Sequence, residues 1–399
     1  MKLPGVKIVP TDGPAALPGD MSIPDGLALS GPARVLVENV HGRGRPQLYK
    51  AGTPAVEDRI DDLARTGGAG KIQETLDQLD VIAGSFDASA VALVRDRLRA
   101  LLGSFADGPL PVSERLAARL AGAPFDAHRI AMLEGLAEVL EARPPAPRAA
   151  LPPPERWEWL PFFEAYFSNF IEGTEFGVEE ACRIALDGVV PADRPADAHD
   201  VAATYRLVAD PDDRMAVPTS GQELLELLMR RHSVLMAARP DKHPGVMKSQ
   251  RNFAGGYAFV EPDLVQGTLI QGFNVVDRLH DPFARAATMM LLVTEAHPFD
   301  DGNGRLARLM ANAELSAAGQ VRIVIPTVYR NDYIAALAGV SHGAGRGESL
   351  VAVLEFAQRW VVAVDWSTFE GANELLTGCN AYLDPGVAEK NAQRLNLPS

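Results

Sequence analysis

The segment PFARAATMMLLVTEA, residues 282–296, constrains the fold of this 399-residue chain more than any other stretch. Asp281 is a favourable helix N-cap and Pro282 a favourable first helical residue, so the segment is predicted to form a helix. Because its side chains are apolar on nearly every face, this helix must be enclosed by other elements. The chain therefore has to supply several neighbouring helices or a sheet around it.

Those neighbours are predicted to be helices, because apolar residues recur at i, i+3, i+4 and i+7 along much of the chain. The main strand signal in the second half is NFAGGYAFV, residues 252–260, in which Gly255 and Gly256 fit the turn of a hairpin. The predicted fold is therefore mostly α, with one hairpin in that half. The expected helices lie at residues 90–104, 127–142, 161–173, 179–186, 197–209, 221–238, 265–279, 305–319 and 349–364.

A proline-rich stretch divides the chain. Six of the eleven residues from Pro144 to Pro154 are proline, which predicts a stiff, extended linker over residues 143–154. Residues 1–150 are interpreted as a separate N-terminal region. Up to about residue 50 this region is rich in Gly, Pro and Val and favours loops and short strands, such as residues 33–40, before the pattern turns helical.

The overall charge and the cysteine content limit the partners and the compartment. A net charge of −14 argues against DNA or RNA as the main partner, but permits a small phosphorylated ligand that needs few cations. The two cysteines, Cys182 and Cys379, lie far apart and fit a reducing compartment. The N-terminus lacks the apolar stretch of a signal peptide, and no run approaches the ~18 apolar residues of a membrane helix. We therefore expect a cytoplasmic protein that binds neither nucleic acid nor membrane.

The densest polar chemistry of the chain follows the enclosed helix, in HPFDDGNGRLAR, residues 297–308. The Gly-Asn-Gly run from Gly302 to Gly304 allows unusual backbone conformations and exposes N–H groups at the start of the next predicted helix, which favours anion binding. Arg305 and Arg308 fall in the first turn of that helix, where cations oppose the helix dipole. Their presence indicates an external anion such as phosphate, with a glycine-rich turn and surface ion pairs as the simpler alternative.

Two further side chains of this stretch suit catalysis beside an anion. His297 is held at the end of a rigid helix by the following Pro298, which suits proton transfer, whereas a lone buried histidine is more often structural. Asp301 precedes the glycines, where its carboxylate could hold Mg²⁺ that bridges two phosphates. A base next to a phosphate cradle favours attack of a hydroxyl on phosphorus without a covalent enzyme intermediate.

Residues 297–308 resemble the signature HPFx(D/E)GNGRxxR of Fic-domain proteins at every defining position. The resemblance implies a compact helical bundle with a hairpin flap, in which Phe299 packs in the core. It also implies AMPylation, the transfer of AMP from ATP to a protein Ser, Thr or Tyr hydroxyl with release of pyrophosphate. The implied roles are general base for His297, Mg²⁺ ligand for Asp301, anion hole for Gly302, Asn303 and Gly304, and β/γ-phosphate ligands for Arg305 and Arg308.

A second motif, SNFIEG from Ser168 to Gly173, lies on a helix predicted upstream of this region. Glu164, Ser168 and Glu172 share one stripe of that helix, and Glu172 stands at its C-terminal end, where a carboxylate opposes the dipole. Considered alone, the helix favours an exposed glutamate. SNFIEG also resembles the (S/T)xxxE(G/N) inhibitory motif of the Fic class with an N-terminal inhibitory helix. In that class the glutamate pairs with the second arginine, here Arg308, and blocks the γ-phosphate, so we expect the isolated protein to be largely inactive.

The hairpin and a later segment carry weaker predictions. The hairpin fits either the family's flap, which aligns the target segment by strand addition, or a plain surface hairpin. The segment VYRNDYIAAL resembles a part of the family that lines the nucleotide pocket, where Asn331 and Tyr333 are candidates and packing is an equal alternative. The residues assigned to the flap are Phe253, Gly255, Gly256 and Tyr257.

With these motifs, the chain is predicted to comprise an N-terminal region (1–150), a helical segment with the inhibitory helix (155–240), a Fic catalytic core (241–345) and C-terminal helices (346–399). We predict an autoinhibited protein adenylyltransferase that uses ATP and Mg²⁺. Its partner would be the hydroxyl of a target protein, with self-AMPylation and a homodimer left open. Two alternatives remain: a de-AMPylase that uses the same site, and a regulatory module that senses nucleotide.

Overall fold

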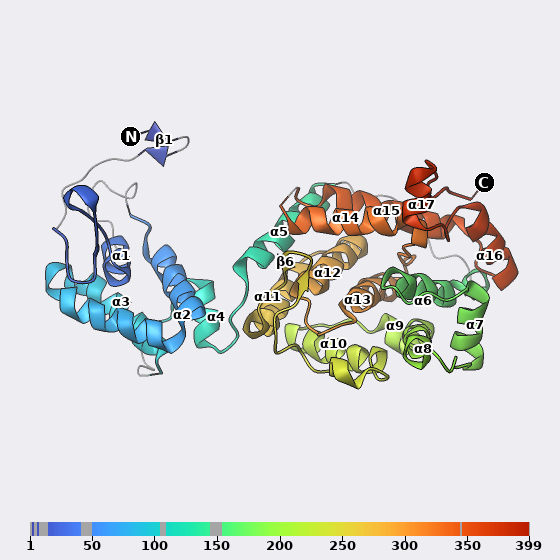
Figure 1. Cartoon of the computed structure of the whole chain (residues 1–399), viewed down its shortest axis with the longest axis horizontal. Coiled ribbons are helices and arrows are strands. Elements are labelled where there is room, and N and C mark those ends of the chain that lie inside the picture. The colour runs from blue at the N-terminus through green and yellow to red at the C-terminus, as the bar shows by residue number, and fades with distance from the viewer. Residues whose placement is uncertain are drawn as a thin grey trace. The chain divides into compact units, whose positions relative to one another are not determined.

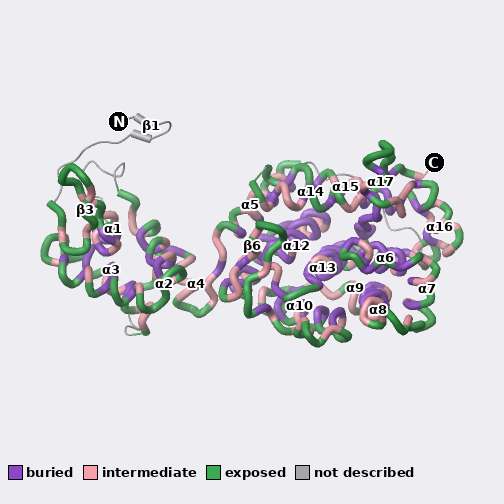
Figure 2. Tube along the Cα trace, viewed as in Figure 1, coloured by how far each residue is buried: buried purple, intermediate pink, exposed green. Residues whose placement is uncertain are grey.

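A computed structural model describes residues 15–40, 50–103, 109–143, 154–343 and 345–398, together with short strands at residues 2–3 and 6–7. The chain divides into two compact units, Met1–Pro124 and Phe125–Ser399, which are described separately. Both are built mainly from helices, which confirms the mostly α fold (Figure 1; Figure 2). Among the described residues, no helix combines the length and the apolarity needed to cross a membrane.

The first unit combines small antiparallel hairpins with helices. Its strands are β1 (Lys2–Leu3) paired with β2 (Val6–Lys7), and β3 (Met21–Ile23) paired with β4 (Leu27–Leu29). Apolar residues of all four α-helices form the core of this unit, with Leu116 as the contribution of the last one. The helices are α1 (Pro32–Asn39), α2 (Thr53–Ile82), α3 (Ala88–Leu101) and α4 (Glu114–Leu120), with short 3-10 helices η1 (Pro24–Gly26) and η2 (Ala83–Ser85).

The prediction of a strand at residues 33–40 is wrong, because most of these residues form α1. Pro32 begins the helix, and the apolar residues after it fall at helical spacing on one face. That face is almost completely buried in the core of the first unit, with exposed fractions of 1–3%. It comprises Ala33, Leu36, Val37 and Val40.

The second unit is a helical bundle with one small hairpin. The α-helices are α5 (Ala127–Ala142), α6 (Leu160–Ile171), α7 (Val178–Asp187), α8 (Pro195–Ala209), α9 (Pro211–Met215), α10 (Gly221–Leu235), α11 (Val265–Asp277), α12 (Pro282–Ala296), α13 (Asn303–Ala317), α14 (Arg330–Ser341), α15 (Glu348–Ala363), α16 (Phe369–Gly378) and α17 (Pro385–Lys390). The short 3-10 helices are η3 (Pro154–Trp157), η4 (Pro240–Lys242), η5 (Pro262–Leu264) and η6 (Thr327–Tyr329). The hairpin consists of β5 (Phe253–Ala254) and β6 (Tyr257–Ala258), and the turn predicted at Gly255 is present, with a φ of 58°.

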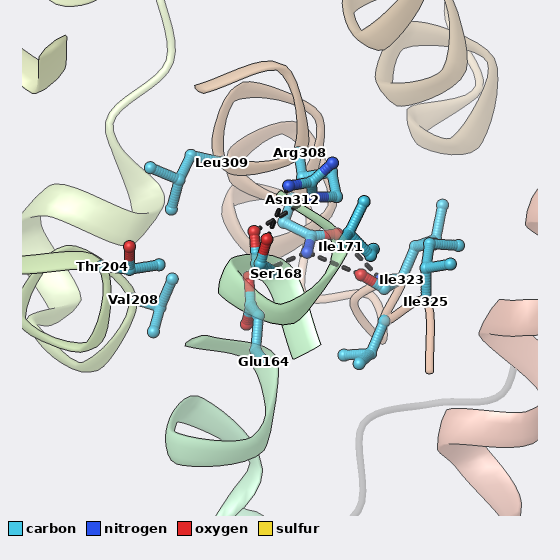
Figure 3. Close-up of a pocket in the computed structure, with 11 residues that line it drawn as sticks. Glu164, Ser168, Ile171, Thr204, Val208, Arg308, Leu309, Asn312, Ile323 and Ile325 are labelled. Atoms are coloured by element: carbon cyan, nitrogen blue, oxygen red, sulfur yellow. Dashed lines mark hydrogen bonds between the residues drawn. The ribbon is translucent and has the colours of Figure 1, made fainter. Parts of the chain in front are cut away.

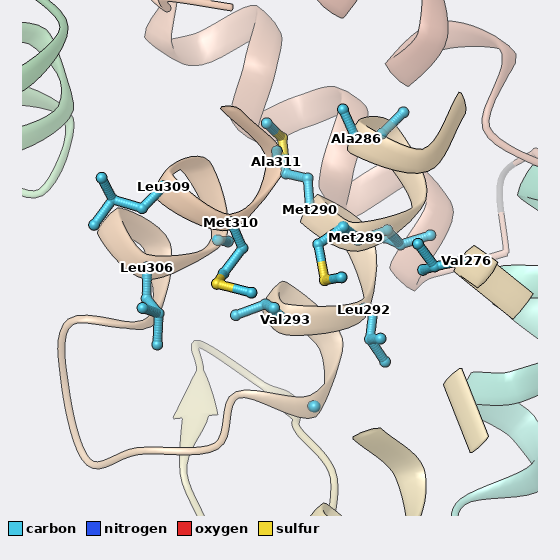
Figure 4. Close-up of a cluster of buried hydrophobic side chains, with 14 of the residues drawn as sticks. Val276, Ala286, Met289, Met290, Leu292, Val293, Leu306, Leu309, Met310 and Ala311 are labelled. Atoms are coloured by element: carbon cyan, nitrogen blue, oxygen red, sulfur yellow. The ribbon is translucent and has the colours of Figure 1, made fainter. Parts of the chain in front are cut away.

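Helix α12 lies in the middle of this bundle, as its apolar composition predicts. It packs against α5, α11 and α13, and most of its residues are buried. Met289, Met290 and Val293 of α12 gather with Leu306 and other apolar residues of α13 in one cluster (Figure 4). This packing gives the segment between α12 and α13 a rigid support at both ends.

The division between the units does not coincide with the predicted proline-rich linker. The first unit ends at Pro124, so α5 belongs to the second unit, whereas the sequence analysis assigned it to the N-terminal region. The reason is that Leu133, Leu136 and Ala137 of α5 are completely buried in the core built around α12. Of the predicted linker, residues 144–153 lie outside the described residues.

An aromatic core fixes the position of α6. Phe163 and Phe167 are fully buried, and their rings lie 5.6 Å from Trp366 and 6.3 Å from Trp360, respectively, between centroids. Aromatic pairs at such distances stabilise a packed arrangement. Because the aromatic face of α6 packs in this core, the polar stripe with Glu164 and Ser168 lies against α13.

Candidate active site

The loop between α12 and α13 is closed by its own side chains. His297 ends α12 in the left-handed region at φ 44°, and Gly302 precedes α13 at φ 76°. Asn303 bridges the loop, because its Oδ1 accepts from the N–H of Phe299 at 2.9 Å and its Nδ2 donates to Phe299 O at 2.8 Å. Phe299 is completely buried, as the resemblance implies, and its ring stacks on His232 at 3.8 Å.

The environment of His297 suits a general base. Its Nδ1 lies 3.1 Å from Thr294 O, and because a carbonyl only accepts, Nδ1 carries the proton and Nε2 is the basic nitrogen. Burial, together with the nearby Lys248 cation, lowers the pKa of His297 to about 4. The imidazole is therefore neutral at neutral pH and ready to accept a proton.

Glu172 and Arg308 form the contact expected from the second motif. Glu172 Oε1 lies 2.7 Å from Arg308 Nη2, and Arg308 also donates to Ser168 Oγ at 3.0 Å and to Ser168 O at 2.8 Å. The Glu172 carboxylate lies against Gly304, where an added Cβ would come within 2.2 Å of Oε1. Gly173 follows at φ 87°, which is the left-handed conformation that ends many helices. A carboxylate thus lies over the first turn of α13, the place predicted for a phosphate.

Arg305, the other predicted phosphate ligand, contacts a protein carboxylate in this structure. Its Nη1 lies 2.9 Å from Asp200 Oδ2 and 3.3 Å from Asn169 Oδ1. Asp200 is buried and is also bound by Arg239, whose Nη2 lies 2.8 Å from Oδ2. Local sequence patterns gave no signal for Asp200, because it comes from α8, far from Arg305 in the chain.

A polar seam joins α6 to α13 along the stripe predicted from the sequence. Glu164 Oε1 accepts from Asn312 Nδ2 at 2.8 Å, and one turn farther along α6 Ser168 contacts Arg308 (Figure 3). Glu172, directly after the end of α6, contacts the same arginine. Glu164 also pairs with Arg322 at 2.6 Å. Burial raises the pKa of Glu164, and the Arg322 cation and the Asn312 amide act against this rise. This seam sets the position of Glu172 over the first turn of α13, where the anion site is predicted.

Asp301 is the one loop carboxylate predicted to bind a metal. Its side chain is exposed, and Oδ1 accepts from the N–H of Gly302 at 2.7 Å. Over the described ranges, no cluster of three or more His, Cys, Asp or Glu side chains could hold a metal ion. A single carboxylate nevertheless fits Mg²⁺, which binds through one or two carboxylates and completes its shell with water and substrate phosphates.

The weaker predictions have mixed outcomes. Phe253 of the hairpin is 58% exposed, whereas the Tyr257 hydroxyl donates to Glu295 at 2.5 Å. Tyr333 is buried and its hydroxyl contacts Arg308, so it adjoins the site. Asn331 is exposed and donates to Glu389 of α17 at 3.0 Å, so the structure does not bring it to the other site residues.

His232, on α10, supports the loop and was not found from the sequence. Its Nε2 lies 3.1 Å from Asp301 O, and its Nδ1 accepts from the N–H of Gly245 at 2.9 Å. These partners require the neutral tautomer, and burial lowers the pKa of His232 to about 4. No local signal reveals this role, since the histidine continues the helical pattern of α10.

We expect His232 to make the second unit sensitive to acid. The unfolded histidine takes up a proton near pH 6.5 and the folded one only near pH 4, so the free energy of unfolding falls as pH drops between these values. The expected loss is up to about 3 kcal/mol. Urea unfolding at pH 7 and pH 4.5, followed by tryptophan fluorescence, should show a smaller loss in His232→Gln than in the wild type. Equal losses would mean that His232 does not titrate differently on folding.

Comparison with known proteins places this geometry in a family. The family model described as Fic/DOC family matches residues 223–315. A Fido domain-containing protein of Dictyostelium discoideum is 34% identical over 98 residues, which cover 68% of that protein and 23% of this chain. The chain belongs to the Fic/DOC family. The match begins in α10 and ends in α13, so it contains the whole Fic loop from His297 to Arg308.

Other relatives of this Fic/DOC protein carry a named activity. The protein adenylyltransferase fic-1 of Caenorhabditis elegans is 27% identical over 192 residues, which cover 44% of this chain and 36% of that protein. The protein adenylyltransferase Fic of Nematostella vectensis is 42% identical over 62 residues, covering 16% of this chain and 14% of that protein. The chain thus spans only about a third of the Caenorhabditis relative's length.

Solved structures of Fic proteins are similar at low identity. A fragment of Fic-1 from C. elegans covers 78% of this chain and 87% of its own length, with 18% identity and a TM-score of 0.43. A Fic domain-containing signaling protein from Bacteroides thetaiotaomicron covers 62% of this chain and 97% of its own, with 19% identity and a TM-score of 0.45.

Proposed function

We propose that the second unit transfers AMP from ATP to a Ser, Thr or Tyr hydroxyl of a target protein, and that Glu172 restrains this activity. The observation that carries the proposal is the Glu172–Arg308 ion pair over Gly304, at the N-terminus of α13. Relatives named protein adenylyltransferases support the activity, although each was matched over part of its length.

The proposed chemistry uses the basic nitrogen of His297. The target hydroxyl oxygen attacks the α-phosphorus of ATP, the bond from that phosphorus to the oxygen bridging the β-phosphate breaks, and pyrophosphate leaves. The hydroxyl proton passes to His297 Nε2. The N–H groups at the start of α13 stabilise charge on the phosphates, because they are fixed before the reaction begins. Asp301 would hold Mg²⁺, which would neutralise phosphate charge.

The proposed restraint is electrostatic. In the inactive form the Glu172 carboxylate takes the place of an anion beside Gly304 and engages Arg308, so the γ-phosphate of ATP meets a negative charge where it needs a positive one. ATP bound under these conditions would be displaced, with its α-phosphorus out of line for attack. Removing the carboxylate frees Arg308 for the γ-phosphate.

The test is label transfer from α-³²P-ATP with Mg²⁺, to the protein itself or to lysate proteins. We expect Glu172→Gly to label roughly 10- to 1000-fold more than the wild type, since like charges near a protein surface repel by up to about 4 kcal/mol. Glu175→Gly is the matched control, because Glu175 is an exposed glutamate in the same loop. Equal labelling by wild type and Glu172→Gly would contradict the proposed restraint by Glu172 but would still support AMP transfer. No labelling by any variant would contradict AMP transfer.

A second candidate is removal of AMP from a modified protein. It is favoured by the proximity of Glu172 to His297, since the carboxylate acts on the pKa of this histidine, with burial as the larger influence. A carboxylate near an imidazole is suited to activating a water. In this case wild-type protein would release label from an AMP-modified target and Glu172→Gly would not. A pure nucleotide sensor would neither transfer AMP to a target nor release it from one.

A further inference from the structure

We propose that Lys248 and Asn252 are positioning residues that clamp the backbone of the His297 loop. They thereby fix the β5–β6 hairpin and the base rigidly to each other. The inference rests on the proposed role of His297 as the base. Both residues lie in the segment that leads into β5, and neither belongs to the loop itself. Nothing in the loop sequence points to them.

The clamp consists of hydrogen bonds to consecutive loop carbonyls. Lys248 Nζ donates to Ala296 O at 3.3 Å, and the backbone N–H of Lys248 donates to Pro298 O at 2.8 Å. Asn252 Nδ2 donates to His297 O at 3.4 Å and to Phe299 O at 3.0 Å. Lys248 Nζ also donates to Asn252 Oδ1 at 2.7 Å, which links the two clamping side chains. Every carbonyl from Ala296 to Phe299 therefore accepts from one of two residues.

The backbone conformation of His297 explains why a clamp is needed. A non-glycine residue in the left-handed region, here at φ 44°, costs free energy and persists only when surrounding contacts fix it. The last carbonyls of a helix also lack partners within the helix. Lys248 and Asn252 supply partners at the end of α12, so they stabilise the conformation that points the imidazole.

The hairpin holds the imidazole ring as well as the loop backbone. Phe259, which follows β6, stacks on the His297 ring with centroids 3.7 Å apart and an angle of 9° between planes. The N–H of Phe259 donates to Asn252 O at 3.3 Å, which closes the base of the hairpin. The residues before the hairpin thus fix the backbone of the base, and the residue after it fixes the ring.

The second strand of the hairpin, β6, is attached to the helices around α12. Arg129 Nη2 of α5 donates to Ala258 O at 2.6 Å, and Arg129 Nε lies 3.1 Å from Glu295 Oε2. Tyr257 donates to the same carboxylate. A target segment that pairs with this hairpin therefore contacts an element that is fixed to α12 and to the base, so target binding and base orientation are coupled.

Lys248 also brings a charge close to the base. Only 5% of Lys248 is exposed, and burial lowers the pKa of its ammonium to about 8. The charged groups that act on His297 are Lys248, Glu172 and Asp301, and the Lys248 cation helps to keep the imidazole neutral. A neutral side chain at 248 would therefore raise the pKa of His297. This effect separates a specific contact with the base from a general loss of packing.

The experiment uses the full chain carrying Glu172→Gly as the parent. We expect Lys248→Met to lower kcat for AMP transfer by up to about 100-fold, with KM for ATP within about twofold of the parent, because misplacement of the base affects the chemical step. In the plot of kcat against pH, the acid limb, which reports the pKa of His297, should move to higher pH. Lys248→Arg should recover most of kcat, since a guanidinium supplies the same cation and donors. Asn252→Ala should lower kcat without moving the acid limb.

Lys242→Met is the matched control, because Lys242 is 40% exposed and pairs with Asp241 away from the clamp. It should leave kcat and the pH profile unchanged. A Lys248→Met variant with the parent's kcat, or one with a raised KM and an unchanged kcat, would overturn the inference.

A readout that needs no turnover separates this inference from the proposed function. The pKa of His297, followed by NMR of the imidazole C–H signals, should rise in Lys248→Met while that of His232 stays unchanged. If the parent labels nothing, the adenylyltransferase proposal fails, and the NMR titration still decides whether Lys248 acts on His297. An unchanged His297 pKa would overturn the clamp in either case.

Discussion

Replacing His297 by Asn in the Glu172→Gly background should lower AMP transfer by about 10²- to 10⁴-fold, the range expected when a general base is lost. Asparagine is chosen because it tolerates the left-handed backbone that His297 adopts at φ 44°. The loop should therefore keep its shape and its anion site. The measurement is initial label transfer at saturating ATP, with Asn331→Ala, on the exposed side of α14, as the control.

The same His297→Asn variant should bind ATP within about threefold of its parent, because the imidazole acts on the incoming hydroxyl and not on the phosphates. Calorimetric titration of ATP with Mg²⁺ measures this affinity. Retained binding with lost transfer identifies an enzyme. Retained transfer would show that another group takes the proton, and loss of both would assign His297 to nucleotide binding.

Replacing Asp200 by Asn should destabilise the second unit by about 3–5 kcal/mol, the cost typical of breaking a buried ion pair from one side. Asp200 is 1% exposed and lies between Arg305 and Arg239, so its loss leaves two guanidinium groups around a neutral amide. The carboxylate also holds Arg305 in place beside the anion site. We therefore expect the change to weaken both the fold and the order of this arginine.

Urea unfolding followed by tryptophan fluorescence measures this effect in the second unit alone, because all four tryptophans, at positions 157, 159, 360 and 366, lie in it. Glu138→Gln is the control, since the Glu138–Arg346 pair is 62–69% exposed and such pairs contribute about 1 kcal/mol or less. A loss for Asp200→Asn no larger than that of the control would mean that the buried pair does not stabilise the unit.

The parts of the structure that were predictable depend on local order in the sequence. Apolar spacing located most of the helices of the second unit, although it missed α9, α14, α16 and α17, and the all-round apolarity of α12 predicted its central place. The Gly-Asn-Gly run marked the start of α13, which is a local feature, and the anion site expected there stays a prediction. The Glu172–Arg308 pair joins distant segments and was expected only through resemblance to a family.

The parts that were not predictable depend on tertiary packing. Asp200, His232 and Lys248 reach the site from three different segments, and no spacing rule connects them to it. Asn331 sits beside Tyr333 in the sequence yet faces α17, because neighbours on a helix point in different directions. Residues 33–40 were assigned to a strand on composition. Most of them form helix α1 instead, because the helix buries its apolar face in the core.

The place of α5 in the second unit determines where the chain can be cut. A catalytic fragment that begins after the proline-rich stretch would lack α5, and the apolar surface that covers Leu133 and Leu136 would meet water. Such a fragment would also lose the Arg129 contact to the hairpin, so inactivity or aggregation would say nothing about catalysis. A fragment that begins at Phe125 keeps this helix, so the site can be studied with these supports intact.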